Sequence, residues 1–249
     1  MSGDSTTTNG HARTNFQPIF IVVMGVASTG KSTIAKALND RLGLPYIEGD
    51  DMHPKSNIDK MSQGIPLTDA DREPWLELIR TTAENIVAEQ EVKARGEDTM
   101  GEEGAEQRTK GRYGVMATSS ALKKYYRDIL RGTYKGFSDV PGHLHAIPSD
   151  KLPTYFVYIK AEESLLRERM AKREGHFMKT NMLDSQLATL ESPEGEENVV
   201  VVPLDATTED QVRIAIEGLE KLVGDLKLVP THASEENNEP LDVKGEHIM

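Results

Sequence analysis

Cysteine is absent from this chain of 249 residues, which excludes disulfide bonds, thiolate catalysis and zinc held by cysteine. The absence agrees with a reducing compartment without establishing one. Long hydrophobic runs are also missing: no apolar stretch approaches the ~18–20 residues of a membrane span. Residues 1–15 are polar and lack the apolar core of a signal peptide. We therefore expect a soluble, cytoplasmic protein.

Positive charge is scarce. Lys and Arg number 29 against 41 Asp and Glu, for a net charge of −12, which argues against nucleic acid or a membrane surface as a partner. Much of the excess is regional, since residues 191–197 and 231–249 are both acidic. A local basic pocket on such a chain can still bind an anionic small molecule. Composition leaves the choice between a monomer and a homodimer open.

The order of apolar and amphipathic segments indicates one domain over residues 16–228, between a disordered tail at 1–15 and a polar tail at 229–249. Five apolar segments predict strands at 19–24, 45–47, 113–119, 154–159 and 199–202. Helical patterns cover 31–42, 75–92, 121–130, 162–173, 186–190 and 209–222, the last capped by Thr208. Strands that alternate with helices predict an α/β fold with a parallel sheet, whose ligands bind at the carboxyl ends of the strands.

Residues Glu91–Arg112 interrupt this pattern, because they are rich in charge and glycine and poor in apolar side chains. We expect a solvent-exposed insertion that is mostly unstructured.

The most specific motif is G-V-A-S-T-G-K-S at Gly25–Ser32, directly after the first predicted strand. It fits the phosphate-binding loop G-x-x-x-x-G-K-[ST], whose backbone N–H groups hold nucleotide phosphates. Lys31 can reach the β- and γ-phosphates, and the Ser32 hydroxyl can bind Mg²⁺. A glycine-rich turn with a surface lysine is the weaker alternative. The predicted ATP-binding residues around the loop are Gly25, Ala27, Ser28, Thr29, Gly30, Lys31, Ser32 and Thr33.

The acids nearest this loop distinguish among nucleotide-binding classes. The guanine-reading motif N-K-x-D of GTPases is absent, and the third predicted strand does not end in the aspartate typical of motor ATPases. The acids instead follow the second strand, in Glu48-Gly49-Asp50-Asp51. This arrangement favours a small-molecule kinase, in which an acid beside the transferred phosphoryl orients the acceptor hydroxyl.

Three segments make the resemblance specific. Gly49–Leu76 reads G-D-D-M-H-P-K-S-N-I-D-K-M-S-Q-G-I-P-L-T-D-A-D-R-E-P-W-L, and Ser120–Asp128 and Arg173–Lys179 carry the second and third matches. Together with the phosphate loop they resemble the bacterial and fungal gluconokinase family over roughly residues 19–222. The resemblance implies a three-layer α/β/α fold similar to shikimate and nucleoside monophosphate kinases, with a five-stranded parallel sheet and a mobile lid at about 165–185.

The same resemblance implies ATP-dependent phosphorylation of D-gluconate to 6-phosphogluconate, with Mg²⁺, as a supply for the pentose phosphate pathway. One departure concerns the metal: where the family has an aspartate two residues before Asp50, this chain has Glu48. The longer side chain can still act as a magnesium partner together with Ser32. A kinase of another hydroxy acid such as shikimate, and a nucleotide-gated interaction protein without catalysis, remain as alternatives.

Asp50 is the residue we expect to accept the proton of the attacking hydroxyl, against an alternative as a turn cap. Arg72 is suited to the substrate carboxylate because guanidinium binds carboxylate through two parallel hydrogen bonds, unless it pairs with Asp69 or Asp71. Trp75 is expected in the core. The remaining candidate substrate-binding residues, each with a structural or solvated alternative, are His53, Asn57, Lys60, Ser120, Lys123, Arg127 and His176.

The basic segment before Gly175 is interpreted as part of the lid rather than as a solvated helix face. Arg169 and Arg173 lie four residues apart, on one helical face, and are expected to stabilise the transferring phosphoryl. His176 and Lys179 are expected to contact gluconate when the lid closes. Asp205, at the end of the fifth strand, is expected near adenine by resemblance.

Overall fold

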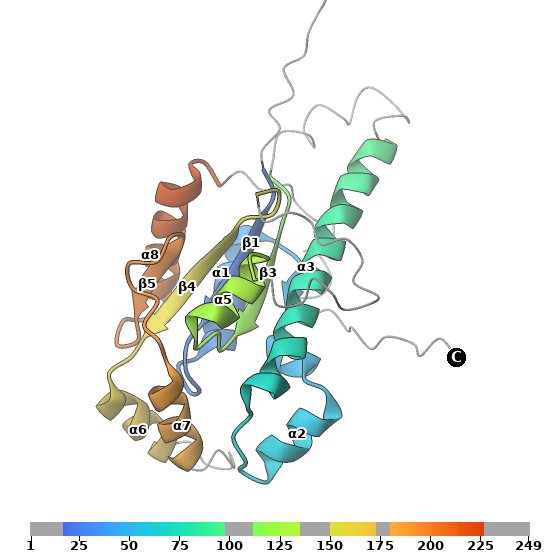
Figure 1. Cartoon of the computed structure of the whole chain (residues 1–249). Helices are drawn as coiled ribbons and strands as arrows, with labels where there is room; N and C mark the ends of the chain where they lie inside the picture. Colours follow the sequence, from blue (N-terminus) through green and yellow to red (C-terminus); the bar gives the residue numbers. More distant parts are fainter. Residues whose placement is uncertain (1–16, 98–111, 135–149, 173–179, 227–249) are drawn as a thin grey trace, which may run out of the picture.

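The computed structural model describes residues 17–97, 112–134, 150–172 and 180–226 (Figure 1). Within them, five strands form one sheet in the order β2-β3-β1-β4-β5, and every pair of neighbours is parallel. The strands are β1 Ile19–Met24, β2 Tyr46–Ile47, β3 Gly114–Ser119, β4 Thr154–Lys160 and β5 Val199–Pro203. All six residues of β1 are buried, as expected for the central strand of a parallel sheet covered on both faces.

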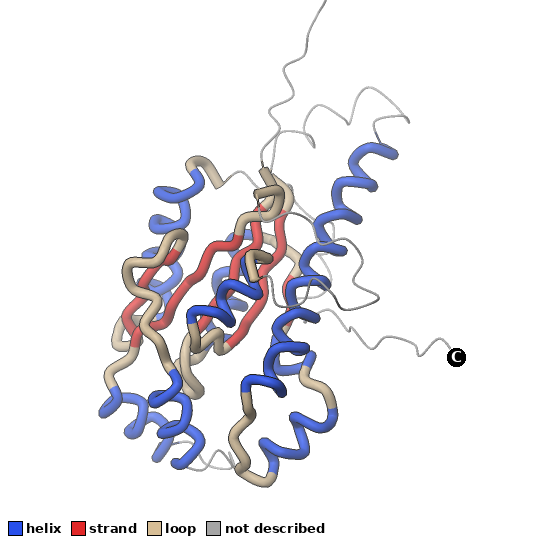
Figure 2. The backbone as a smooth tube through the Cα atoms, in the orientation of Figure 1, coloured by secondary structure: helices blue, strands red, loops and turns tan. Residues whose placement is uncertain are grey.

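Helices cover both faces of the sheet, which confirms the predicted three-layer α/β/α fold (Figures 1 and 2). On one face α1 (Lys31–Leu42) packs beside α8 (Thr208–Val223), and on the other α3 (Asp69–Glu97) packs beside α5 (Lys124–Arg131). Trp75 of α3 is almost completely buried, so its predicted place in the core is confirmed.

Short elements gather at the carboxyl ends of the strands, the lower end of the molecule in Figure 1. They are the 3₁₀ helix η1 (Gly49–Met52) and the helices α2 (Lys55–Ser62), α6 (Glu163–Lys172) and α7 (Thr180–Thr189). In the view of Figure 1, α2 lies toward one side of this end and α6 and α7 toward the other. The fold therefore brings the segments that carry the predicted site to one edge.

The prediction of an unstructured insertion from Glu91 onward is wrong where the chain is described. Helix α3 continues to Glu97, and Arg112 is buried, donating to the carbonyl oxygens of Gln17 at 2.7 Å and Val223 at 3.1 Å. The signal was misread because a charged solvent-facing end of a long helix has the composition of a loop. Residues 98–111 lie outside the described residues.

Two helix starts also differ from prediction. Helix α8 is capped by Thr207 and not by Thr208: the Thr207 hydroxyl accepts a 3.1 Å hydrogen bond from the Asp210 backbone N–H. Helix α7 begins at residue 180, before the predicted start at 186. Both predicted tails, residues 1–15 and 229–249, lie outside the described residues. A search of the described residues finds no helix long and apolar enough to cross a membrane.

Candidate active site

The phosphate loop joins β1 to α1 at the centre of the carboxyl edge. Gly25 and Gly30 have φ angles of 152° and 83°, in the region that favours glycine. The carbonyl oxygen of Val26 accepts hydrogen bonds from the Thr29 hydroxyl at 2.9 Å and the Lys31 ammonium at 3.1 Å. The loop is thus internally braced, with Lys31 folded over its own backbone.

Asp50 stands in η1, close enough to Lys31 for their charges to interact. The residue keeps contact with solvent, yet the protein packed around its carboxyl removes much of its water and raises the pKa of Asp50. The charge of Lys31 opposes this rise, and the carboxylates of Glu48 and Asp51 add to it. A carboxylate with a raised pKa beside a phosphate-binding lysine is suited to accept a proton from an acceptor hydroxyl.

Glu48 is fixed by two hydroxyl groups from neighbouring strands. Tyr46 donates a 2.6 Å hydrogen bond to Glu48 Oε2, and Thr118 donates to Glu48 Oε1. Burial first, and then the Glu48 carboxylate, raise the pKa of Tyr46 far above its usual value, so this phenol remains a donor. The Ser32 side chain also acts on the Tyr46 hydroxyl, opposing part of the rise, which brings both predicted metal residues into one cluster.

This donor set fits Mg²⁺, which prefers oxygen ligands, usually keeps several waters and takes the rest of its shell from substrate phosphates. Ser32 would supply one hydroxyl ligand, and the oriented Glu48 carboxylate would accept from the cation's waters. No group of three or more His, Asp or Glu suited to a metal ion is found in the part of the chain that the structure describes.

His53 follows Asp50 at the end of η1, and its ring packs against Trp75 of α3. Their rings stack with centroids 4.1 Å apart, and burial, helped by the positive charge of Arg72, lowers the pKa of His53 to about 4. Asn57 is almost fully buried and places its Nδ2 amide 3.3 Å from His53 Nδ1 and 2.8 Å from the Asp71 carbonyl oxygen. Because the amide can only donate to Nδ1, neutral His53 carries its proton on Nε2.

Arg72 is buried without an ion pair in the described residues. Its side chain donates a 3.4 Å hydrogen bond from Nε to the Leu67 carbonyl oxygen. Both candidate partners are taken elsewhere: Asp71 pairs with Lys60 at 2.5 Å, and Asp69 pairs with Lys123 at 2.7 Å. A buried guanidinium without a carboxylate is a strong candidate for an anionic ligand.

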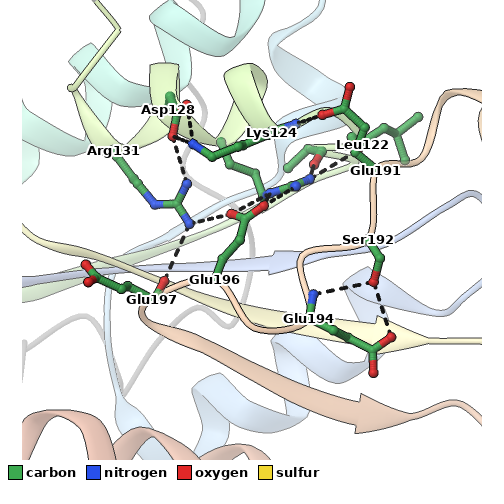
Figure 3. Close-up of polar contacts among 11 residues, drawn as sticks. Leu122, Lys124, Asp128, Arg131, Glu191, Ser192, Glu194, Glu196 and Glu197 are labelled. Atoms are coloured by element: carbon green, nitrogen blue, oxygen red, sulfur yellow. Dashed lines mark hydrogen bonds and ion pairs between the residues drawn. The ribbon is translucent and has the colours of Figure 1, made fainter.

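Two of the predicted substrate residues after β3, Lys123 and Arg127, have protein partners. Arg127 has no exposed side-chain surface and forms an ion pair with Glu196, at 2.5 Å, while it also donates to the carbonyl oxygens of Ala121 and Leu122. Figure 3 shows this network joining α5 to the segment before β5. Arg127 thus has the contacts of a structural residue, whereas Ser120 is half-buried at the carboxyl edge.

The structure describes only part of the predicted lid. Helix α6 matches the predicted basic helix, and Arg169 donates a 3.0 Å hydrogen bond to the carbonyl oxygen of Leu204, next to the exposed Asp205. Arg169 is therefore directed toward the end of β5, where adenine is expected. Arg173, His176 and Lys179 lie outside the described residues.

The sequence analysis did not predict three residues that contribute to the site. Tyr46 orients Glu48, the Trp75 indole holds the Gly49 carbonyl oxygen at 2.7 Å, and Gln186 of α7 accepts a 2.6 Å hydrogen bond from the Ala27 backbone N–H. Tyr46 was detectable, because a tyrosine two residues before an acid on a strand points to the same side. The other two depend on tertiary packing.

A parallel sheet with a phosphate loop after its central strand β1, and acids after its edge strand β2, defines the chain as a P-loop kinase of the small-molecule class. No protein-family model matches the chain, but several known proteins resemble it in sequence. The chain is 41% identical over 186 residues to the gluconokinase of Gluconobacter oxydans, covering 75% of this chain and 83% of that one. It is 36% identical over 207 residues to a probable gluconokinase of Schizosaccharomyces pombe, covering 83% and 90%.

Solved structures agree. A gluconokinase from Sinorhizobium meliloti is 39% identical with a TM-score of 0.59, over 83% of this chain and 94% of that one. A sugar kinase from Janibacter is 34% identical with a TM-score of 0.62, over 86% and 99%. The chain belongs to the gluconokinase family.

Proposed function

We propose that this gluconokinase transfers the γ-phosphoryl group of ATP to the terminal hydroxyl of D-gluconate and releases ADP and 6-phosphogluconate. The observation that carries the proposal is the position of Asp50 in η1, close enough to Lys31 of the phosphate loop for their charges to interact. The relatives named gluconokinase supply the acceptor. In the reaction the hydroxyl oxygen forms a bond to the γ-phosphorus, the bond from that phosphorus to the β–γ bridging oxygen breaks, and Asp50 takes the hydroxyl proton.

The phosphate loop and Lys31 hold the β- and γ-phosphates, and Ser32 with Glu48 holds the magnesium site. The cation, when bound with nucleotide, neutralises charge on the phosphate oxygens. From the lid, Arg169 and Arg173 add positive charge at the transferring group, and Asp205 lies near adenine.

Gluconate is a carboxylate with a chain of hydroxyls, so its site needs one cation and several neutral donors and acceptors. Arg72 supplies the cation. His53 is neutral above about pH 4 and donates from Nε2, and Asn57 holds it in place. Lys60, Ser120, Lys123 and the lid residue His176 complete the predicted contacts, whereas Arg127 is held by Glu196 and by the carbonyl oxygens of Ala121 and Leu122.

The test replaces Asp50 by asparagine and compares it with Asp51→Asn, its exposed neighbour in η1. We expect kcat of Asp50→Asn to fall by about 10²–10⁴-fold, the usual range for loss of a general base, with ATP affinity nearly unchanged. Asp51→Asn should stay within about threefold of wild type. An Asp50→Asn enzyme within threefold of wild type would remove Asp50 from its role, and normal transfer by Lys31→Ala would remove the kinase mechanism.

A further inference from the structure

Gln186 and Ala27 are 159 residues apart in sequence and directly bonded in the structure. The backbone N–H of Ala27 donates a 2.6 Å hydrogen bond to the side-chain oxygen of Gln186. Ala27 is buried and Gln186 half-buried, so this hydrogen bond is partly shielded from water, which strengthens it.

The donor in this contact belongs to the phosphate loop. The N–H groups of such a loop bind phosphate oxygens, and here a neutral amide oxygen lies on one of them. A backbone N–H has one proton, so an oxygen of the bound nucleotide and the Gln186 oxygen compete for it. The phosphate oxygen is charged, and a charge-assisted hydrogen bond is roughly twice as strong as a neutral one.

Helix α7 is held independently of this bond. Leu183 is completely buried in the core, and Asp184 forms a 2.6 Å ion pair with Arg167 of α6. Beyond the helix, the Glu191 backbone N–H donates to the Leu122 carbonyl oxygen at 2.9 Å. Loss of the Gln186 contact would thus leave α7 folded and paired with α6 while freeing it from the phosphate loop.

We propose that Gln186 is a positioning residue of the nucleotide site: it occupies the Ala27 N–H while the loop is empty, and an incoming phosphate displaces it. Nucleotide binding is thereby coupled to the attachment of α7 to the loop. The inference rests on the proposed kinase function, because it takes Ala27 as a phosphate-binding residue.

The test measures binding of a non-hydrolysable ATP analogue with Mg²⁺ by calorimetry, without gluconate. Gln186→Ala removes the competitor and should bind the analogue about fivefold tighter, the worth of one net hydrogen bond. Gln186→Glu keeps the acceptor, adds negative charge beside the phosphates, and should bind several-fold weaker. Ser185→Ala, the adjacent position, is the matched control and should equal wild type.

The opposite signs of the two variants separate competition from a structural role, which would weaken binding in both. Weaker or unchanged binding by Gln186→Ala, with its melting temperature unchanged, overturns the proposal. Hydrogen exchange gives a second readout: the analogue should speed exchange in residues 180–189 of wild type and leave Gln186→Ala unaffected. Equal effects in both also overturn it. Neither failure touches the gluconokinase proposal, which is tested by transfer to gluconate.

Discussion

The indole N–H of Trp75 donates a 2.7 Å hydrogen bond to the carbonyl oxygen of Gly49. Gly49 immediately precedes Asp50, and the other side of this aspartate is bounded by His53, which stacks on the same indole. One core side chain therefore supports the candidate base and a candidate substrate donor. Gly49 is itself confined, since a Cβ there would lie 2.0 Å from the Thr118 carbonyl oxygen.

Replacing Trp75 by phenylalanine should cost about 1–3 kcal/mol of stability, because it leaves the Gly49 carbonyl oxygen without its partner. The kcat should fall with it, as η1 loses its support, while ATP affinity changes little. Urea unfolding and steady-state kinetics check both effects. Leu78→Ala, at an exposed position of the same helix, should stay within about 0.5 kcal/mol. A fully stable and active Trp75→Phe would contradict the support role.

Replacing Tyr46 by phenylalanine should weaken ADP binding about fivefold in the presence of Mg²⁺ and leave it unchanged in EDTA. The reason is that the variant frees one oxygen of Glu48 from its hydroxyl donor and so loosens the metal cluster. Calorimetry with and without Mg²⁺ measures the difference. Tyr155→Phe, a buried strand tyrosine in β4, is the control. Equal weakening under both conditions would rule out a role through the cation.

His53 should titrate near pH 4 and carry its proton on Nε2 above that pH, both visible by ¹⁵N–¹H NMR. The folded-state pKa is below the ordinary value of 6.5, so the unfolded chain binds this proton first. The free energy of unfolding should therefore fall as pH is lowered from about 6.5 to 4. The loss is up to about 3 kcal/mol, since each unit of pKa difference between the folded and unfolded states contributes about 1.36 kcal/mol. His53→Asn should remove this part of the pH dependence. A native-state pKa near 6.5 would show that the His53 ring is not shielded from water by the packing around it.

Glu196→Gln should destabilise the fold by about 3 kcal/mol, because it leaves the guanidinium of Arg127, with 0% exposed side-chain surface, without its carboxylate. Glu194→Gln, whose ion pair with Lys160 is about half exposed, should cost less than about 1 kcal/mol. Denaturant unfolding compares the two. Similar values would mean that the network of Figure 3 contributes little.

The same network predicts acid sensitivity. Burial acts to raise the pKa of Glu196, but hydrogen bonds from Arg127 and Arg131 outweigh it and hold that pKa below its usual value. The stabilisation is therefore complete above the ordinary glutamate pKa and is lost as pH falls through the lower folded-state value. Glu196→Gln should flatten the stability curve in this acidic range.

Local patterns predicted the architecture well, because the strands are short apolar runs and helices such as α1 and α8 bury apolar residues at helical spacing. Ile19–Met24 was predicted to the residue. The start of α3 was missed: Thr68 and Asp71 bond reciprocally and start the helix at Asp69. The prediction placed the start of the helix at Trp75, because Trp75 is the first of the apolar residues that recur at helical spacing.

The site was predictable where a motif fixes it and not where tertiary packing decides. Lys31 and Ser32 were chosen from the spacing of the phosphate-loop motif, and Asp50 from its place after the second strand and from the family resemblance. The buried ion pair of Arg127 could not be predicted from the local sequence. Its partner Glu196 lies 69 residues away, in an acidic segment. Gln186 was equally hidden, since nothing local links a helical glutamine to a distant glycine-rich loop.

ADP release measured with ATP and Mg²⁺ across separate acceptors tests whether gluconate is the phosphoryl acceptor. Gluconate should raise release far above the rate without acceptor, and shikimate, glucose and AMP should not. Release that is equal without any acceptor, or faster with one of the other three, would show that gluconate is not the acceptor.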